Sequence, residues 1–314
     1  MFYPYRLAIA ALAIFVHVTA SQATYSYSDT DSGRAGYLPN QNIDPAVIGS
    51  KSAGSLFAKE FNDDEEFYAE PLVYAPDGED QLLFLASSQN RIRTLDAETG
   101  DTINERQVQT PFQSSDLNCT EYGKTEGISG TPIIDPATNI AYFFAKSYLS
   151  NFRTVGDRGA YNGVYYLYGV DIYTLEDVLG FPILMDGYTS DNTTDRYFLG
   201  GIFRQSTSLV QVHDVIYGGF GGRCGSFPAL NNTALVIGVN VTSKELVTDY
   251  PVQSGSLAAR NPEDITEKQG DVFTTGMEIS TDGKRLYLLS RQGKPGTPVS
   301  STALIQDETF VNDP

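Results

Sequence analysis

The chain contains little histidine or cysteine and no tryptophan. Its two histidines are His17, which lies in an N-terminal export signal considered below, and His213, which lies in a Val-His-Asp turn. Zinc sites need three or four nitrogen or sulfur ligands, and a serine hydrolase needs a histidine base beside its nucleophile. The sequence therefore argues against a histidine-based metal site. We expect His213 to be a solvated turn residue.

Basic charge is also scarce. The formal net charge is −18 at pH 7, and no run of Lys and Arg is longer than a dipeptide. Proteins that bind nucleic acids or anionic membrane surfaces usually carry concentrated positive charge. The composition therefore argues against both as partners, although acidity is also a common solubility device of secreted proteins.

Long apolar runs are missing except for Leu7–Val18 near the N-terminus, which is short for a membrane-spanning helix. Arg6 precedes this run, and small and polar residues follow it. This order is typical of a secretory signal peptide, with cleavage after Ala20 or Ala23. We therefore predict that residues 1–23 are a signal peptide and that the protein is extracellular. A membrane anchor is the alternative.

Four Asn-x-Ser/Thr sequons agree with export, at Asn118, Asn192, Asn231 and Asn240. The two cysteines are Cys119 and Cys224. In an oxidising compartment we expect them to form one disulfide, and two free, buried thiols are the alternative. The predicted product is a secreted glycoprotein.

Residues 126–178 form the clearest structural unit of the sequence. Apolar and aromatic stretches at Gly130–Ile134, Ile140–Ser147, Gly163–Asp171 and Val178–Leu184 are separated by polar turn residues. Val, Ile, Tyr and Phe favour strands, whereas Asp-Pro and Asn favour chain reversals. The stretch predicts four strands in series.

The same pattern recurs along the chain. Equivalent head positions are 61, 76 and 69 residues apart, and they are Pro71, Pro132, Ser208 and Met277. We expect three fairly complete units and part of a fourth over residues 55–292, with an extra short strand at Ser55–Phe61. An irregular leader at 24–54 and a flexible tail at 293–314 flank them. Repeats of four short strands predict an all-β fold, specifically a β-propeller. A β-sandwich is the competing fold, but it does not require internal similarity.

Leu95–Val108, LDAETGDTINERQV, is similar to the pyrroloquinoline-quinone repeat. In that turn Gly100 is expected to adopt positive φ, and Asp96 to accept backbone N–H bonds. Together with the strands above, the motif resembles the secreted quinoprotein-like β-propeller proteins of fungi over roughly residues 55–290. The resemblance implies a ring of blades, each built like the unit at 126–178.

Two departures from this family limit what the resemblance implies. Quinoprotein dehydrogenases hold the quinone between a tryptophan and a ring formed by adjacent cysteines, and this chain has neither feature. We therefore predict no cofactor. The chain is also short for a large ring, which leaves two arrangements. Ser55–Phe61 closes a small four-bladed ring, or the chain is a truncated member with an open crescent.

In a propeller the first strand of each blade lines the axial channel, so the residues at the start of these strands face the usual ligand mouth. This placement predicts a set of ligand-binding candidates, namely Glu70, Glu126, Ser129, Arg204, Gln205, Thr274 and Thr275. A water-filled polar channel is the alternative interpretation. Tyr165, Tyr166 and Tyr168 are expected to be interblade core. The glycines of 218–222 are expected to allow close blade packing and not to bind phosphate, because neither a helix nor Lys-Ser/Thr follows.

These features predict a monomeric, extracellular binding or scaffold module. The expected ligand is a small molecule, glycan or peptide. The alternative is an extracellular enzyme, either carbohydrate-active through the channel carboxylates or a quinone-dependent oxidoreductase. No catalytic residue is predicted.

Overall fold

A computed structural model describes residues 33, 35, 46, 49–50, 54–61, 64–75, 80–117, 123–153, 162–186, 198, 200–222, 235–251, 279–287 and 306–307. The predicted signal peptide, both cysteines, three of the four sequons, Thr274 and Thr275 lie outside these residues. No helix in the described part is long and apolar enough to cross a membrane.

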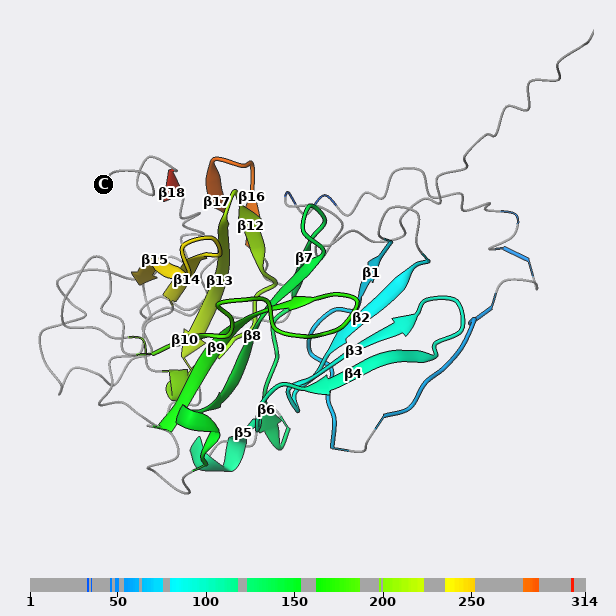
Figure 1. Cartoon of the computed structure of the whole chain (residues 1–314), viewed down its shortest axis with the longest axis horizontal. Helices are drawn as coiled ribbons and strands as arrows, with labels where there is room; N and C mark the ends of the chain where they lie inside the picture. The colour runs from blue at the N-terminus through cyan, green and yellow to red at the C-terminus, as the bar shows by residue number, and fades with distance from the viewer. Residues whose placement is uncertain are drawn as a thin grey trace, which may run out of the picture.

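Four antiparallel sheets follow one another along the chain (Figure 1). Blade 1 contains β1 (Leu72–Tyr74), β2 (Leu82–Ala86), β3 (Arg91–Asp96) and β4 (Thr102–Gln107). Blade 2 contains β7 (Ile133–Asp135), β8 (Ile140–Tyr148), β9 (Gly163–Asp171) and β10 (Ile183–Met185). Blade 3 contains β11 (Phe203–Gln205), β12 (Val210–Val212), β13 (Val215–Gly222), β14 (Leu235–Asn240) and β15 (Glu245–Pro251). A fourth sheet contains β16 (Ser280–Thr281), β17 (Arg285–Tyr287) and β18 (Gln306–Asp307).

Short elements join the blades. The hairpin β5 (Phe112–Gln113) and β6 (Thr125–Glu126) and the 3-10 turn η1 (Ser114–Leu117) lie between blades 1 and 2. The turn η3 (Gly200–Ile202) precedes β11 of blade 3, and a further turn, η2 (Leu149–Asn151), lies within blade 2 after β8. Strands pair in chain order in blades 1 and 2, and in blade 3 β11 and β12 both pair with β13, which is followed by β14 and β15. The structure is therefore all-β and built from β-propeller blades, as the sequence predicts.

Corresponding turns follow the third strand of each blade. Asp96 accepts hydrogen bonds from the backbone N–H groups of Glu98 and Thr99. Asp171 and Asn240 accept the same pair of bonds in blades 2 and 3. Four residues after each of these acceptors the backbone has positive φ, at Gly100, Leu175 and Lys244. The predicted Asp96 and Gly100 geometry is therefore confirmed, and it recurs in all three blades.

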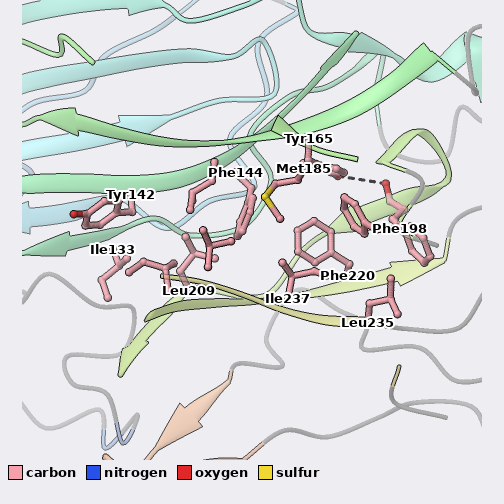
Figure 2. Close-up of a cluster of buried hydrophobic side chains, with 14 of the residues drawn as sticks. Ile133, Tyr142, Phe144, Tyr165, Met185, Phe198, Leu209, Phe220, Leu235 and Ile237 are labelled. Carbon is pink, nitrogen blue, oxygen red and sulfur yellow. Dashed lines mark hydrogen bonds between the residues drawn. The ribbon is translucent and has the colours of Figure 1, made fainter. Parts of the chain in front are cut away.

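The strands of blade 2 are buried on both faces, which explains their nearly continuous apolar sequence. Phe143 and Tyr168 pack toward blade 1, and their rings stack at 5.3 Å. Tyr142, Phe144 and Tyr165 pack toward blade 3 (Figure 2). Because strand side chains alternate between faces, one strand supplies both cores. Tyr165 and Tyr168 are thus interblade core, as predicted, and Tyr166, which is partly exposed, packs against the core between blades 1 and 2.

Glycines allow aromatic rings to cover the adjacent strand. Gly169 pairs with Tyr142, and Gly238 pairs with Tyr217 at the same place in blade 3. A Cβ on Gly238 would lie 2.7 Å from the Tyr217 ring. Gly218, within β13, lies against Leu209 and the Phe144 ring of blade 2, so this part of the glycine run serves blade packing.

Three predictions of detail are wrong. Residues 55–61 contain no strand, since they form an extended segment beside the blade 1 turn. The fourth strand of blade 2 is Ile183–Met185 rather than Val178–Leu184, and only an isolated bridge at Asp177 precedes it. The third repeat is offset by one residue, because Val210 pairs with Tyr217 as Ile133 pairs with Tyr142. Leu209, not Ser208, therefore matches Pro132.

Candidate axial binding site

The segments that lead into the inner strands of blades 1, 2 and 3 contact one another. Thr131, just before β7, accepts a hydrogen bond through its hydroxyl from the Glu70 backbone N–H at 2.9 Å. Its carbonyl accepts another from the Leu209 N–H at 3.0 Å. These bonds bring the leading segments of the three blades to one place, as the propeller hypothesis requires.

Glu126 lies within this region but is buried. The Lys146 ammonium donates to its carboxylate at 3.1 Å, and the exposed fractions of the two side chains are 0% and 2%. Lys146 also donates to the carbonyls of Gly201 and Phe203, both at 2.9 Å. Its Nζ lies 4.4 Å from the centroid of the Phe112 ring. The lysine thus links blade 2 to the hairpin before it and to blade 3 after it.

Gln205 and Ser129 are buried as well. The Gln205 amide lies directly on Gly130, where a Cβ would come within 2.1 Å of Oε1. The Gln205 N–H donates to the Tyr165 hydroxyl at 2.9 Å. Within the described residues, Gln205 Oε1 and Ser208 Oγ are buried without a hydrogen-bond partner. These two oxygens are acceptors that an ordered water or a ligand group could satisfy.

A tyrosine and two carboxylates that precede blade 1 form the more accessible part of the site, next to a buried arginine of blade 3. The Arg204 guanidinium of blade 3 lies 4.6 Å from the centroid of the Tyr68 ring, which precedes blade 1. The Tyr68 hydroxyl donates to Glu66 at 2.7 Å. Tyr68, Glu66 and Glu70 are partly exposed, whereas Arg204 is buried beneath them. The surface therefore presents an aromatic ring and two carboxylates, with a buried guanidinium against the ring.

The predicted set is therefore divided. Glu70 remains accessible, and Glu126, Ser129, Arg204 and Gln205 are buried in the interblade polar network. No described group of three His, Cys, Asp or Glu residues could hold a metal ion. His213 is an exposed turn residue with positive φ, as expected.

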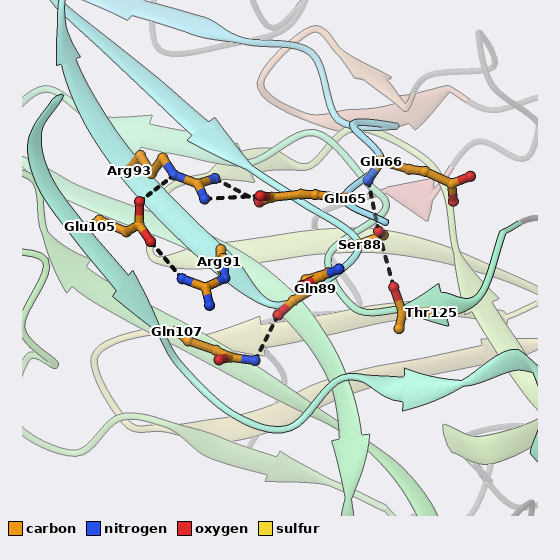
Figure 3. A network of polar contacts seen from close by, with 9 residues as sticks. All are labelled: Glu65, Glu66, Ser88, Gln89, Arg91, Arg93, Glu105, Gln107 and Thr125. Atoms are coloured by element: carbon orange, nitrogen blue, oxygen red, sulfur yellow. Dashed lines mark hydrogen bonds and ion pairs between the residues drawn. The ribbon is translucent and has the colours of Figure 1, made fainter. Parts of the chain in front are cut away.

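The sequence interpretation missed two buried charge clusters. Arg93 donates to both oxygens of Glu65 at 2.6 and 2.9 Å and to Glu105 at 2.7 Å (Figure 3). This contact lowers the pKa of the Glu105 carboxyl. Figure 3 also places Ser88 between Glu66 and Thr125. The Ser88 hydroxyl accepts a hydrogen bond from the Glu66 N–H and another from the Thr125 hydroxyl, the latter at 3.1 Å.

Asp116 is the centre of the second cluster. It accepts hydrogen bonds from Arg153 and from the Tyr148 hydroxyl, the latter at 2.6 Å. Burial, together with the hydrogen bond to Asp116, raises the pKa of Tyr148. A charged residue inside an aromatic strand, Lys146 within IAYFFAKSY, is the sequence signal that could have revealed the buried ion pair with Glu126.

Comparisons with known proteins find distant structural likeness only. No family model and no curated protein sequence matches the chain. A quinohemoprotein alcohol dehydrogenase from Comamonas testosteroni matches with 12% identity and a TM-score of 0.40 over 71% of this chain and 35% of that one. A second quinohemoprotein alcohol dehydrogenase, from Pseudomonas putida, matches with 10% identity and a TM-score of 0.39 over 72% of this chain and 34% of that one. BamB from Moraxella catarrhalis matches with 17% identity and a TM-score of 0.34 over 70% of this chain and 44% of that one. The chain thus spans less than half the length of these three proteins.

Proposed function

We propose that this protein is a secreted, N-glycosylated β-propeller that binds an extracellular ligand or acts as a scaffold. In this proposal the ligand contacts the axial surface formed by Glu66, Tyr68 and Glu70 over Arg204. The observation that carries the proposal is the Arg204–Tyr68 contact, since it joins the leading segments of two blades at a partly exposed surface.

The chemistry of this surface favours a ligand with several hydroxyl or amide groups. Carboxylates accept hydrogen bonds, the tyrosine ring offers an apolar face, and the guanidinium supplies positive charge. Glycans and peptides present such groups. Buried polar oxygens nearby, at Gln205 and Ser208, add acceptors for bridging waters.

Burial of Glu126 favours binding over hydrolysis. A glycosidase needs two carboxyl groups that reach the scissile bond. Glu126 is 2% exposed and paired with Lys146, so it is poorly placed to serve as an acid or nucleophile. The ion pair explains the carboxylate as an interblade contact.

The test is binding of the purified glycoprotein to an array of oligosaccharides and to a peptide library. For any probe that binds, Glu70→Ala and Tyr68→Ala should each weaken the affinity by about tenfold or more, which is typical of central contacts. Glu98→Ala, which removes an exposed carboxylate from the blade 1 turn, is the matched control and should leave affinity unchanged.

Equal affinity for all three variants would refute the axial surface as the binding site. Turnover of any oligosaccharide that Glu126→Gln abolishes, with the fold intact by circular dichroism, would support the enzymatic alternative instead. Mass spectrometry of the secreted protein tests export and glycosylation. Asn240 is the sequon within the described residues, where its side chain organises the turn after β14.

A further inference from the structure

Blade 1 has one face packed against blade 2 and one face packed against a non-strand segment. This segment, which we name the cap segment, comprises residues 54–61 and 64–67. In Figure 1 its blue trace passes along β3 and β4, on the side of the sheet away from blade 2. The cap segment thus occupies the side on which another blade would stack.

Strand pairing shows which residues of the three blades are equivalent. Leu85 pairs with Arg93 in blade 1 as Phe143 pairs with Tyr168 in blade 2. In blade 2, Phe143 and Tyr168 belong to the face that receives blade 1. Leu85 and Arg93 therefore lie on the corresponding receiving face of blade 1.

That receiving face carries a charge where blade 2 carries an aromatic ring. Arg93, the counterpart of Tyr168, is 2% exposed. A buried guanidinium requires compensating partners, because its desolvation is costly. Glu105 supplies one partner from the same sheet, and Glu65 of the cap segment supplies the other with two hydrogen bonds.

Aromatic and backbone contacts complete the cover. The Phe61 ring lies 4.5 Å from the Arg93 guanidinium carbon and 5.1 Å from the Phe67 ring. The Ser88 N–H donates to the Glu66 carbonyl at 2.8 Å. At the outer end of the sheet Lys59 donates to the Gly100 carbonyl at 2.7 Å. The cap segment is therefore fixed along the receiving face by contacts from Lys59 to Glu66.

We propose that the cap segment replaces a neighbouring blade on blade 1 and thereby blocks head-to-tail stacking of a second copy of the chain. Such stacking is heterologous, because the receiving face of one copy would meet a different surface of the next copy, and heterologous contacts that do not close produce open assemblies. The Arg93 charge disfavours contact of the receiving face with an apolar blade surface. Glu65 pairs with that charge only when the cap segment is in place.

The test uses the full chain with two sets of substitutions. Phe61→Ala with Glu65→Ala removes the ring and the carboxylate that hold the cap segment. Adding Arg93→Tyr restores on the receiving face the aromatic residue found at Tyr168. Asp64→Ala is the matched control, because Asp64 also lies in the cap segment but, among the described residues, makes only an exposed ion pair, with Lys124.

Hydrogen exchange and light scattering give separate readouts. The double variant should raise amide exchange of Glu66 and Ser88 by about tenfold or more relative to Asp64→Ala, because local opening governs exchange there. The triple variant should form concentration-dependent dimers and larger species, whereas the Asp64→Ala protein should not. Lys59→Ala, which loosens only the outer end, is the milder variant should the double one fail to fold, and it should raise exchange in residues 54–61.

Unchanged exchange in the Lys59→Ala and double variants would overturn the cap assignment. A triple variant that exchanges rapidly but stays monomeric at every concentration would overturn the role in blocking stacking. Loss of axial ligand binding with no change in exchange or mass would bear on the proposed function and not on the cap.

Discussion

Lys146 donates to Glu126 at 3.1 Å in an ion pair that is closed to solvent, and it also donates to the carbonyls of Gly201 and Phe203 at the start of blade 3. The pair therefore ties three successive parts of the chain together through one ammonium group. Its position at the interblade junction suggests a structural role, which leads to the first prediction.

Lys146→Met should lower the free energy of unfolding by about 3–5 kcal/mol, because it leaves the Glu126 carboxylate buried without its cation. Urea denaturation followed by circular dichroism measures this loss. Combining Lys146→Met with Glu126→Leu removes both charges and should recover part of it. Lys124→Ala, at an exposed pair with Asp64, should change stability by less than about 0.5 kcal/mol. A double variant no more stable than Lys146→Met would contradict the ion-pair interpretation.

Glycine opposite an aromatic ring gives the second prediction. A Cβ at Gly169 would lie 2.9 Å from the rings of Tyr142 and Phe181, and at Gly238 it would lie 2.7 Å from Tyr217. Gly169→Ala and Gly238→Ala should each cost about 1–3 kcal/mol through overpacking. Gly54→Ala is the control, because nothing lies within 4 Å of its Cβ position. Equal denaturation midpoints for the three variants would show that the rings move aside.

Local turns and strands could be predicted from the sequence, whereas the burial of charged side chains could not. Asp96, Gly100 and the strand Gly163–Asp171 could be predicted because turn chemistry and strand alternation are local properties. The burial of Glu126 could not, since its partner Lys146 is 20 residues away and that lysine also donates to the backbone carbonyls of Gly201 and Phe203, more than 50 residues further on. The sequence shows that Glu126 precedes a strand of blade 2, but the fold decides whether its carboxylate faces solvent.

The extended segment at 55–61 illustrates a second limit. Its sequence, SLFAKEF, carries the apolar and aromatic residues that favour strands, yet no neighbouring strand edge among the described residues pairs with it. Phe57 instead lies on Gly100, and Lys59 bonds the turn of blade 1. A strand needs a partner edge as well as a suitable pattern, and the pattern alone cannot supply one.

Acid should destabilise the protein through carboxylates whose pKa is lowered in the folded state. The Arg93 hydrogen bond lowers the pKa of Glu105 below its ordinary value of 4.5, and backbone N–H groups, chiefly that of Thr99, lower the pKa of Asp96 below 3.8. Their contribution is present above these ordinary values and is lost as pH falls through the folded-state values.

The urea midpoint should therefore fall as pH decreases from about 5 to about 3. Glu105→Gln should reduce this dependence, whereas Glu98→Gln, at an exposed turn position, should not. An identical pH profile for Glu105→Gln and the unsubstituted protein would remove the Arg93 contact as its cause.

Alkali should destabilise the protein through buried tyrosines. Burial, and secondarily the nearby Asp135 carboxylate, raises the pKa of Tyr142 from 10.0 to about 12. Burial also raises the pKa of Tyr168 and Tyr148. A raised folded-state pKa means that the unfolded chain releases its phenolic protons first, so stability is full below pH 10.0 and declines as pH rises through the folded-state value.

Ultraviolet absorbance of tyrosinate during a pH titration measures this directly. Folded protein should show fewer ionised tyrosines at about pH 11 than the same chain in urea, because buried phenols stay protonated. Tyr142→Phe should lessen the loss of stability between pH 10.0 and about 12, whereas Tyr173→Phe, at a side chain that is 42% exposed, should leave the profile unchanged. Because the Tyr142 ring lies against Gly169, phenylalanine keeps that contact, so the difference between Tyr142→Phe and the unsubstituted protein isolates the hydroxyl. Matching profiles would mean that Tyr142 ionises without cost in the folded state, and its burial between blades 2 and 3 would then be too loose to form an interblade core.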